Sequence, residues 1–183
     1  TLALNNTNTY SAGTTLTDGT LILGANGALG TGTFAFNGGT LRTTLSGGVT
    51  INNLTQINAT PPRVAGTESI TFAGGFVLGA SRNIQNELTG GAKLTISGTG
   101  ITNTASTLTL FGSGDTLIST TTGTGTSRVT MAGTGRLDLT ATNTATGDLS
   151  TQRGTIAISG ATGRWAGTIT IAPSGTLILD NSA

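Results

Sequence analysis

The segment from Thr107 to Leu179 repeats one short apolar phrase: Leu108-Thr109-Leu110, Leu117-Ile118, Val129-Thr130-Met131, Leu137-Asp138-Leu139, Leu149, Ile156-Ala157-Ile158, Ile169-Thr170-Ile171 and Leu177-Ile178-Leu179. The first apolar residues of successive phrases lie 9, 12, 8, 12, 7, 13 and 8 positions apart, so a long step alternates with a short one. Every second phrase therefore returns after about 20 residues, which gives one series at 108, 129, 149 and 169 and another at 117, 137, 156 and 177. A fixed period of this size is typical of stacked repeat architectures.

The phrase itself has the pattern of a short β-strand. Alternate residues of a strand face opposite sides, so two apolar residues around one small or polar residue place two side chains inward and one outward. A single coil leaves its inward side chains open to water, and stacking coils about 4.8 Å apart buries them. We therefore predict an all-β parallel β-helix, or β-solenoid, of about nine coils of roughly 20 residues, with two strands in each coil. Residues 117, 137, 156 and 177 should form one interior column.

The first 53 residues follow the same pattern, because Leu21 and Leu41 are again 20 residues apart. The middle of the chain is less regular. Pro61 and Pro62 cannot donate to a strand ladder, so we expect an irregular loop over about 56–67. We interpret residues 1–183 as a single solenoid segment. Neither terminal stretch has the polar outer face of a solenoid cap, and we therefore expect a fragment of a larger protein.

The composition excludes several classes of function. Only 8% of residues are charged and the net charge is +1, which gives no basic patch for nucleic acid or for a membrane surface. The chain has no cysteine and no histidine, so disulfides, thiolate metal sites and Ser-His or Cys-His nucleophile pairs are excluded. No apolar run reaches the roughly 18 residues of a membrane-spanning helix.

Both ends of the chain resemble a known repeat. Residues 6–24, 27–32 and 37–41, together with 143–147, 154–156 and 174–183, are similar to the autotransporter-associated β-strand repeat of bacterial passenger domains. Ala12 stands where a second glycine is usual, and the copy at Ala145-Thr146 lacks the aromatic residue found at Tyr10. The resemblance covers about half of the chain, and the middle shares only the period.

The resemblance implies a right-handed solenoid in a bacterial protein that is secreted or attached to the outer membrane. It brings no catalytic residues and no cofactor, so we do not expect an enzyme. The partners that it implies are flanking coils of the same protein, a second copy joined end to end, surface glycans, or host and abiotic surfaces. We expect no nucleic acid and no membrane insertion.

Four residues are candidates for a site. Asp115, within Gly112-Ser113-Gly114-Asp115, resembles half a turn of a calcium-binding repeat, but calcium takes six to eight oxygen ligands, so a turn residue is the plainer interpretation. Arg136 and Asp138 lie on one predicted strand, with Ile118 one coil back and Ala157 one coil forward. An aspartate flanked by basic residues on such a face is what a polysaccharide lyase or hydrolase would use, so both are candidate ligand residues. Their plainer interpretation is a solvated surface pair. Trp165 could stack on a sugar or pack over a loop.

The sequence therefore favours a structural and adhesive module of a surface or secreted fibre. Two alternatives stay open. A self-assembling filament subunit would join end to end through uncapped coils. A carbohydrate-active β-helix, whether lyase, hydrolase or tailspike-like, would need a second carboxylate about 5–10 Å from Asp138 for hydrolysis.

Overall fold

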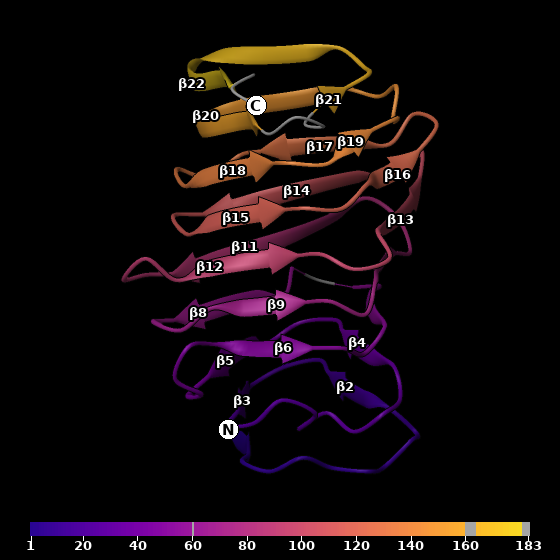
Figure 1. Cartoon of the computed structure of the whole chain (residues 1–183), viewed down its shortest axis with the longest axis vertical. Coiled ribbons are helices and arrows are strands. Elements are labelled where there is room, and N and C mark those ends of the chain that lie inside the picture. Colours follow the sequence, from indigo (N-terminus) through magenta and orange to yellow (C-terminus); the bar gives the residue numbers. More distant parts are fainter. Residues whose placement is uncertain (60, 160–163, 181–183) are drawn as a thin grey trace.

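The computed structural model describes residues 1–59, 61–159 and 164–180, and in this part of the chain the strands stack into a parallel β-solenoid (Figure 1). The described residues form about eight turns of about 21 residues and contain no helix, so the predicted all-β solenoid is confirmed. The number of turns is one lower than the predicted nine, because the middle turns are longer than 20 residues. Ile70 pairs with Leu94, 24 positions on, and Phe76 pairs with Ile101, 25 positions on.

From β5 (Thr40–Thr43) onward each turn crosses three faces, A, B and C, whereas the first two turns have strands on faces A and C only. Face A consists of β1 (Leu2–Leu4), β3 (Thr20–Leu23), β5 (Thr40–Thr43), β8 (Arg63–Gly66), β11 (Arg82–Leu88), β14 (Thr107–Gly112), β17 (Arg128–Met131) and the first parts of β20 (Leu149–Ser159) and β22 (Ile169–Asp180). Face B consists of β6 (Val49–Ile51), β9 (Ile70–Phe72), β12 (Lys93–Ile96), β15 (Asp115–Ile118), β18 (Arg136–Leu139) and the second parts of β20 and β22. Because β20 and β22 run over both faces, faces A and B form one hydrogen-bonded sheet.

Face C is the face that the two-strand prediction missed. It consists of β2 (Thr14–Leu16), β4 (Phe34–Phe36), β7 (Thr55–Ile57), β10 (Phe76–Leu78), β13 (Ile101–Thr104) and β16 (Thr122–Thr124), followed by the two-stranded pair β19 (Thr142–Asn143) and β21 (Arg164–Trp165). Several of its interior positions are polar, including Thr55, Thr122 and Asn143, which are at most 2% exposed. An apolar alternation cannot reveal a strand whose inward residues are hydroxyls and amides.

Hydrogen bonds within the stack satisfy these buried polar groups. Asn143 Oδ1 accepts from the backbone N–H of Thr122 at 2.6 Å and from its hydroxyl at 2.8 Å. Asn53, 7% exposed, donates to the carbonyl oxygens of Gly30 at 3.1 Å and Gly32 at 2.6 Å. A buried polar group is tolerated when it is paired in this way.

The first predicted series is confirmed as an interior column. On face A, Leu108 pairs with Val129, Val129 with Leu149, and Leu149 with Ile169. The first three of these side chains are at most 1% exposed. Each rung thus covers the apolar residue of the rung below, which is how a chain without a globular centre buries its side chains.

The second predicted series is correct for three of its four members. Leu137, Ile156 and Leu177 lie over one another, but the residue beneath Leu137 is Thr116, not Leu117. Thr116 is 1% exposed, and its hydroxyl accepts a hydrogen bond from Asn86 Nδ2 at 3.1 Å. Because this partner satisfies the hydroxyl, threonine takes the interior position and Leu117 faces outward.

The expected loop over 56–67 is wrong for half of its length, where the chain forms strands. Gln56 and Ile57 belong to β7 and residues 63–66 form β8, so the chain stays in the solenoid, while Thr60 lies outside the described residues. Pro61 and Pro62 determine only where β8 begins, which is at Arg63. The backbone N–H of Arg63 donates to Gly39 O at 3.0 Å, and Pro62 uses its carbonyl to accept from the N–H of Gln85 at 2.9 Å.

Aromatic side chains fill the interior of the first turns. Phe34 and Phe36 stack with ring centroids 5.3 Å apart, and Phe72 lies 6.4 Å from Phe36 and 5.4 Å from Phe76. All four side chains are at most 1% exposed. The later turns use leucine, isoleucine, valine and one methionine at the equivalent depth.

Strand β11 shifts the sheet sideways on face A. Its first five residues pair with β14, and its last four pair with β8. Only Gln85 and Asn86 pair on both sides. The rungs above β11 therefore continue from its N-terminal part and the rungs below it continue from its C-terminal part.

Candidate functional site

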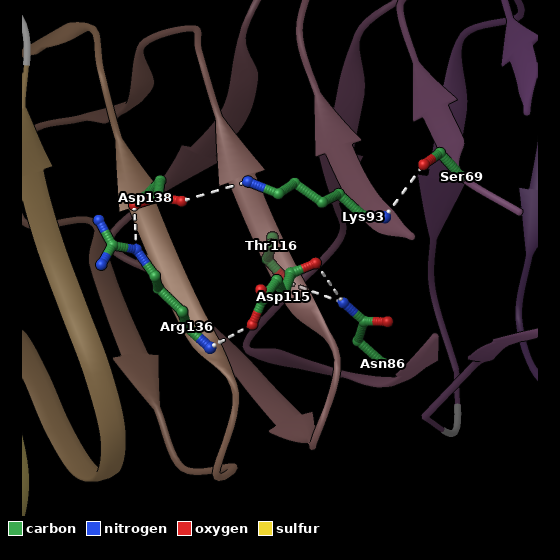
Figure 2. Close-up of polar contacts among 7 residues, drawn as sticks. All are labelled: Ser69, Asn86, Lys93, Asp115, Thr116, Arg136 and Asp138. Atoms are coloured by element: carbon green, nitrogen blue, oxygen red, sulfur yellow. Dashed lines mark hydrogen bonds and ion pairs between the residues drawn. The ribbon is translucent and has the colours of Figure 1, made fainter. Parts of the chain in front are cut away.

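Charged side chains gather on the outer side of face B, where Figure 2 shows Lys93, Asp115, Arg136 and Asp138 on three successive strands. Lys93, Asp115 and Arg136 are the first residues of β12, β15 and β18, so the strand starts bring them together. Lys93 pairs directly with Asp115 in the parallel register. Asp138 lies two residues after Arg136, and therefore on the same side of the sheet.

Asp138 is held between two cations. Its Oδ1 lies 2.6 Å from Arg136 Nε, and its Oδ2 lies 3.9 Å from Lys93 Nζ. The Asp138 side chain is 13% exposed, whereas the arginine and lysine side chains are 42% and 47% exposed. The two long side chains shield the carboxylate from water, and the solvent still screens their charges. This arrangement joins three turns of the solenoid electrostatically.

The neighbours of Asp138 in the stack are partly those expected. Ala157 lies one coil forward, as predicted, but Leu117 lies one coil back where Ile118 was expected, which is the same one-residue error as in the interior column. No carboxylate is paired with Asp138 on either adjacent rung. The sequence analysis did not identify Lys93 as a partner of Asp138, because the two are 45 residues apart. Lys93 lies on β12, two rungs below Asp138 on β18.

Asp115 connects rungs through backbone groups. Its Oδ1 accepts the N–H of Arg136 at 3.0 Å, and its carbonyl accepts from Asn86 Nδ2 at 2.9 Å. One rung below, the backbone N–H of Lys93 donates to Ser69 Oγ at 3.1 Å. Among the described residues, no three of His, Cys, Asp and Glu come together as a metal site would require. The Asp115 carboxylate therefore has a structural role, because it links the start of β15 to the start of β18.

Trp165 lies apart from this cluster. It belongs to β21, where it pairs with Asn143, and its indole Nε1–H donates to the carbonyl of Gly147 at 3.0 Å. The ring is half-buried and packs against the interior cluster. Of the three predicted ligand residues, Arg136 and Asp138 are together on face B, while Trp165 anchors a rung on another side of the solenoid.

The two end rungs expose apolar side chains in the described structure. Leu2 in β1 is 58% exposed, and Ile171 and Leu179 in β22 are 47% and 63% exposed. Because of the shift at β11, the first part of β22 lies over 82–84, whereas β1 lies under 86–88. The end strands are therefore not in line, and end-to-end association stays a prediction. Within the described ranges, no helix has the length and apolarity needed to cross a membrane.

Comparison with known proteins found no matching family model, no matching curated protein and no matching solved structure. The β-solenoid is therefore established from this chain alone. The resemblance of both ends to the autotransporter-associated repeat stays a prediction, together with the handedness and location that it implies.

We predict that Lys93, Arg136 and Asp138, the triad on face B, contribute a small, salt-dependent stabilisation. Asp138→Asn removes the shared negative charge and leaves Arg136 and Lys93 facing each other, so we expect a loss of about 1 kcal/mol in the free energy of unfolding at low salt. The loss should shrink at high salt, because partly exposed charges are screened within about 3 Å at 1 M ionic strength. Urea unfolding at two salt concentrations measures both effects.

The control for this prediction is Asp148→Asn. Asp148 forms a single ion pair with Arg128 at 3.7 Å, and both side chains are at least half exposed. We expect a change of only a few tenths of a kcal/mol there. Equal losses in the two variants, or a loss at Asp138 that salt leaves unchanged, would contradict the role assigned to the triad.

Proposed function

We propose that the chain is a rigid structural segment of a bacterial cell-surface or secreted fibre, which holds its outward-facing residues at a fixed distance from an attachment point. The observation that carries the proposal is the unbroken strand pairing along the stack. One sheet runs from β1 to β22 without interruption among the described residues. The location in a surface or secreted protein rests on the repeat resemblance at both ends of the sequence.

The physical basis of this role is that each turn is stabilised mainly by its two neighbours. Such a quasi-one-dimensional stack has no separate centre, so it lengthens by adding turns at little change in stability per turn. Bending or stretching it requires several parallel backbone hydrogen bonds to lengthen together. Because most strands are short and the connections between them are short, few exposed segments are long enough to enter a protease.

A distance measurement tests the rigidity. The chain has no cysteine, so Thr17→Cys and Gln152→Cys give two unique positions for spin labels, and both residues are exposed. We expect one narrow distance distribution centred at about 30 Å, because the labels are separated by between six and seven rungs of about 4.8 Å each. Electron–electron double resonance at low protein concentration measures it.

The same doubly labelled chain in denaturant is the control and should give a broad distribution. A broad or multiple distribution under native conditions would overturn the rigid-segment proposal. Antibody labelling of intact producing cells, compared with permeabilised cells, tests the location separately. Labelling that requires permeabilisation would contradict a surface position and leave the distance result unaffected.

A further inference from the structure

A second group of exposed side chains lies on the outer side of face A. Arg63, Gln85 and Phe111 are aligned on three successive rungs, since Gln85 pairs with both of the others. Arg42 is one rung below Arg63 and two residues along its own strand from Thr40, with which Arg63 pairs. All four side chains are exposed, including 40% of Phe111. We call these four residues the face A patch.

The two arginines of the patch, like Arg153, differ from Arg82, Arg128 and Arg136, whose side chains are bound to protein groups. Arg128 and Arg136 each pair with an aspartate, and Arg82 donates to the backbone oxygens of Ile57 and Asn58. The guanidinium groups of Arg42 and Arg63 have no hydrogen bond or ion pair with any described residue. An unpaired guanidinium offers a planar fork of donors that matches a carboxylate.

One carboxylate lies beside the patch. Glu87 is half-buried on the same outer side, two rungs above Arg42 with Ala65 between them. Its Oε1 accepts a hydrogen bond from Gln85 Nε2 at 2.9 Å. The neutral amide leaves the charge of Glu87 in place, so two guanidinium groups and one carboxylate give this surface a net charge of +1.

Phe111 adds an apolar ring to this polar surface. Its neighbours Leu110 and Gly112 cannot cover it, because Leu110 points into the solenoid and glycine has no side chain. An exposed aromatic ring on a flat sheet is a stacking surface for the C–H face of a sugar ring. Arg63, Gln85 and Phe111 together form a row parallel to the axis of the stack.

We infer that the face A patch binds a linear polysaccharide that carries carboxylates, with the glycan chain lying along the solenoid axis. Arg42 and Arg63 bind the carboxylates in bidentate fashion, Gln85 donates to or accepts from a hydroxyl, and Phe111 packs against a sugar ring. The guanidinium groups, the amide and the aromatic ring follow one another along the stack axis. This order matches a polymer that presents carboxylates, hydroxyls and apolar sugar-ring faces along its length. The inference adds a ligand to the proposed rigid segment. It depends on the proposed surface or secreted location only because the polymer must be able to reach the chain.

Binding to oligogalacturonate tests the assignment, with the methyl-esterified oligomer as the matched ligand that lacks the charges. We expect the full chain to bind the acid form, and we expect Arg63→Ala, Arg42→Ala and Phe111→Ala each to weaken binding about tenfold, which corresponds to the loss of one charge-assisted or stacking contact. Arg63→Lys keeps the charge without the fork and should recover only part of the affinity. Isothermal titration at low salt measures these affinities.

The control is Arg153→Ala, because Arg153 is exposed, its guanidinium has no hydrogen bond or ion pair with a described residue, and it lies outside the patch on β20. It should leave binding unchanged. Equal weakening by Arg153→Ala, equal binding of the esterified oligomer, or tighter binding of single-stranded DNA than of the acid oligomer would overturn the assignment, as would no binding at millimolar ligand. None of these results would alter the label distance that tests rigidity, so the two proposals fail separately.

Discussion

Replacing Gly112 with alanine should destabilise the chain by about 3 kcal/mol or more, because the substitution combines strained backbone with a collision in the stack. Gly112 has a φ of 93°, which favours glycine. A Cβ at this position would overlap the backbone oxygen of Asn86 on the rung below. The overlap is with backbone, so no side-chain rotation relieves it, and the rungs must separate. Chemical denaturation measures the loss.

Gly91 provides the matched control. Its φ of 83° is similarly unfavourable for alanine, but no atom lies within 4 Å of the position that a Cβ would take. Gly91→Ala should therefore show only the backbone strain, about 1–2 kcal/mol. If the two variants lose the same stability, close approach between rungs is not what requires glycine at 112.

Phe72→Ala should cost roughly 3–5 kcal/mol of the free energy of unfolding, the range for removal of a fully buried aromatic side chain. Phe72 is 1% exposed and lies between Phe36 and Phe76, so its removal leaves a cavity that involves three turns. Stacked strands cannot close such a cavity without changing the rung spacing. Chemical denaturation gives the total loss, and amide hydrogen exchange should show faster exchange in β4, β6 and β10.

Phe111→Ala is the control for aromatic size alone. Phe111 is 40% exposed, and its removal leaves no enclosed cavity, so we expect a change within about 0.5 kcal/mol. A loss comparable to that of Phe72→Ala would contradict the placement of the aromatic core. A small loss also shows that Phe111→Ala is folded, which the binding experiment requires.

The regular part of the fold could be predicted because inward positions there are apolar and the turns keep nearly one length. Leu108, Val129, Leu149 and Ile169 follow each other at 20 or 21 residues, and they form the column that the period indicates. The period fails by one residue at Leu117, because Thr116 beneath Leu137 is polar and buried. A pattern of apolar residues cannot identify an interior hydroxyl whose partner, Asn86, lies 30 residues earlier.

From the sequence, the candidate site could be predicted only for residues that share one strand. Arg136 and Asp138 are two residues apart, so strand alternation alone places them on the same side. Lys93 joins them because the two intervening turns are 22 and 21 residues long, and a constant period of 20 misplaces it by three positions. The face A patch was missed for the same reason. Arg63, Gln85 and Phe111 are 22 and 26 residues apart, in the part of the chain where turn length varies most.

The sideways shift at β11 changes how the solenoid can come apart. Above it, the rungs are bonded to residues 82–86, and below it they are bonded to residues 85–88. Each half of the solenoid is therefore hydrogen-bonded to a different part of β11, and the two parts overlap at residues 85 and 86 only. Unfolding that starts at either end of the described stack reaches a strand that the opposite half still holds by hydrogen bonds. We therefore expect the two halves to unfold independently and β11 to lose its hydrogen bonds last.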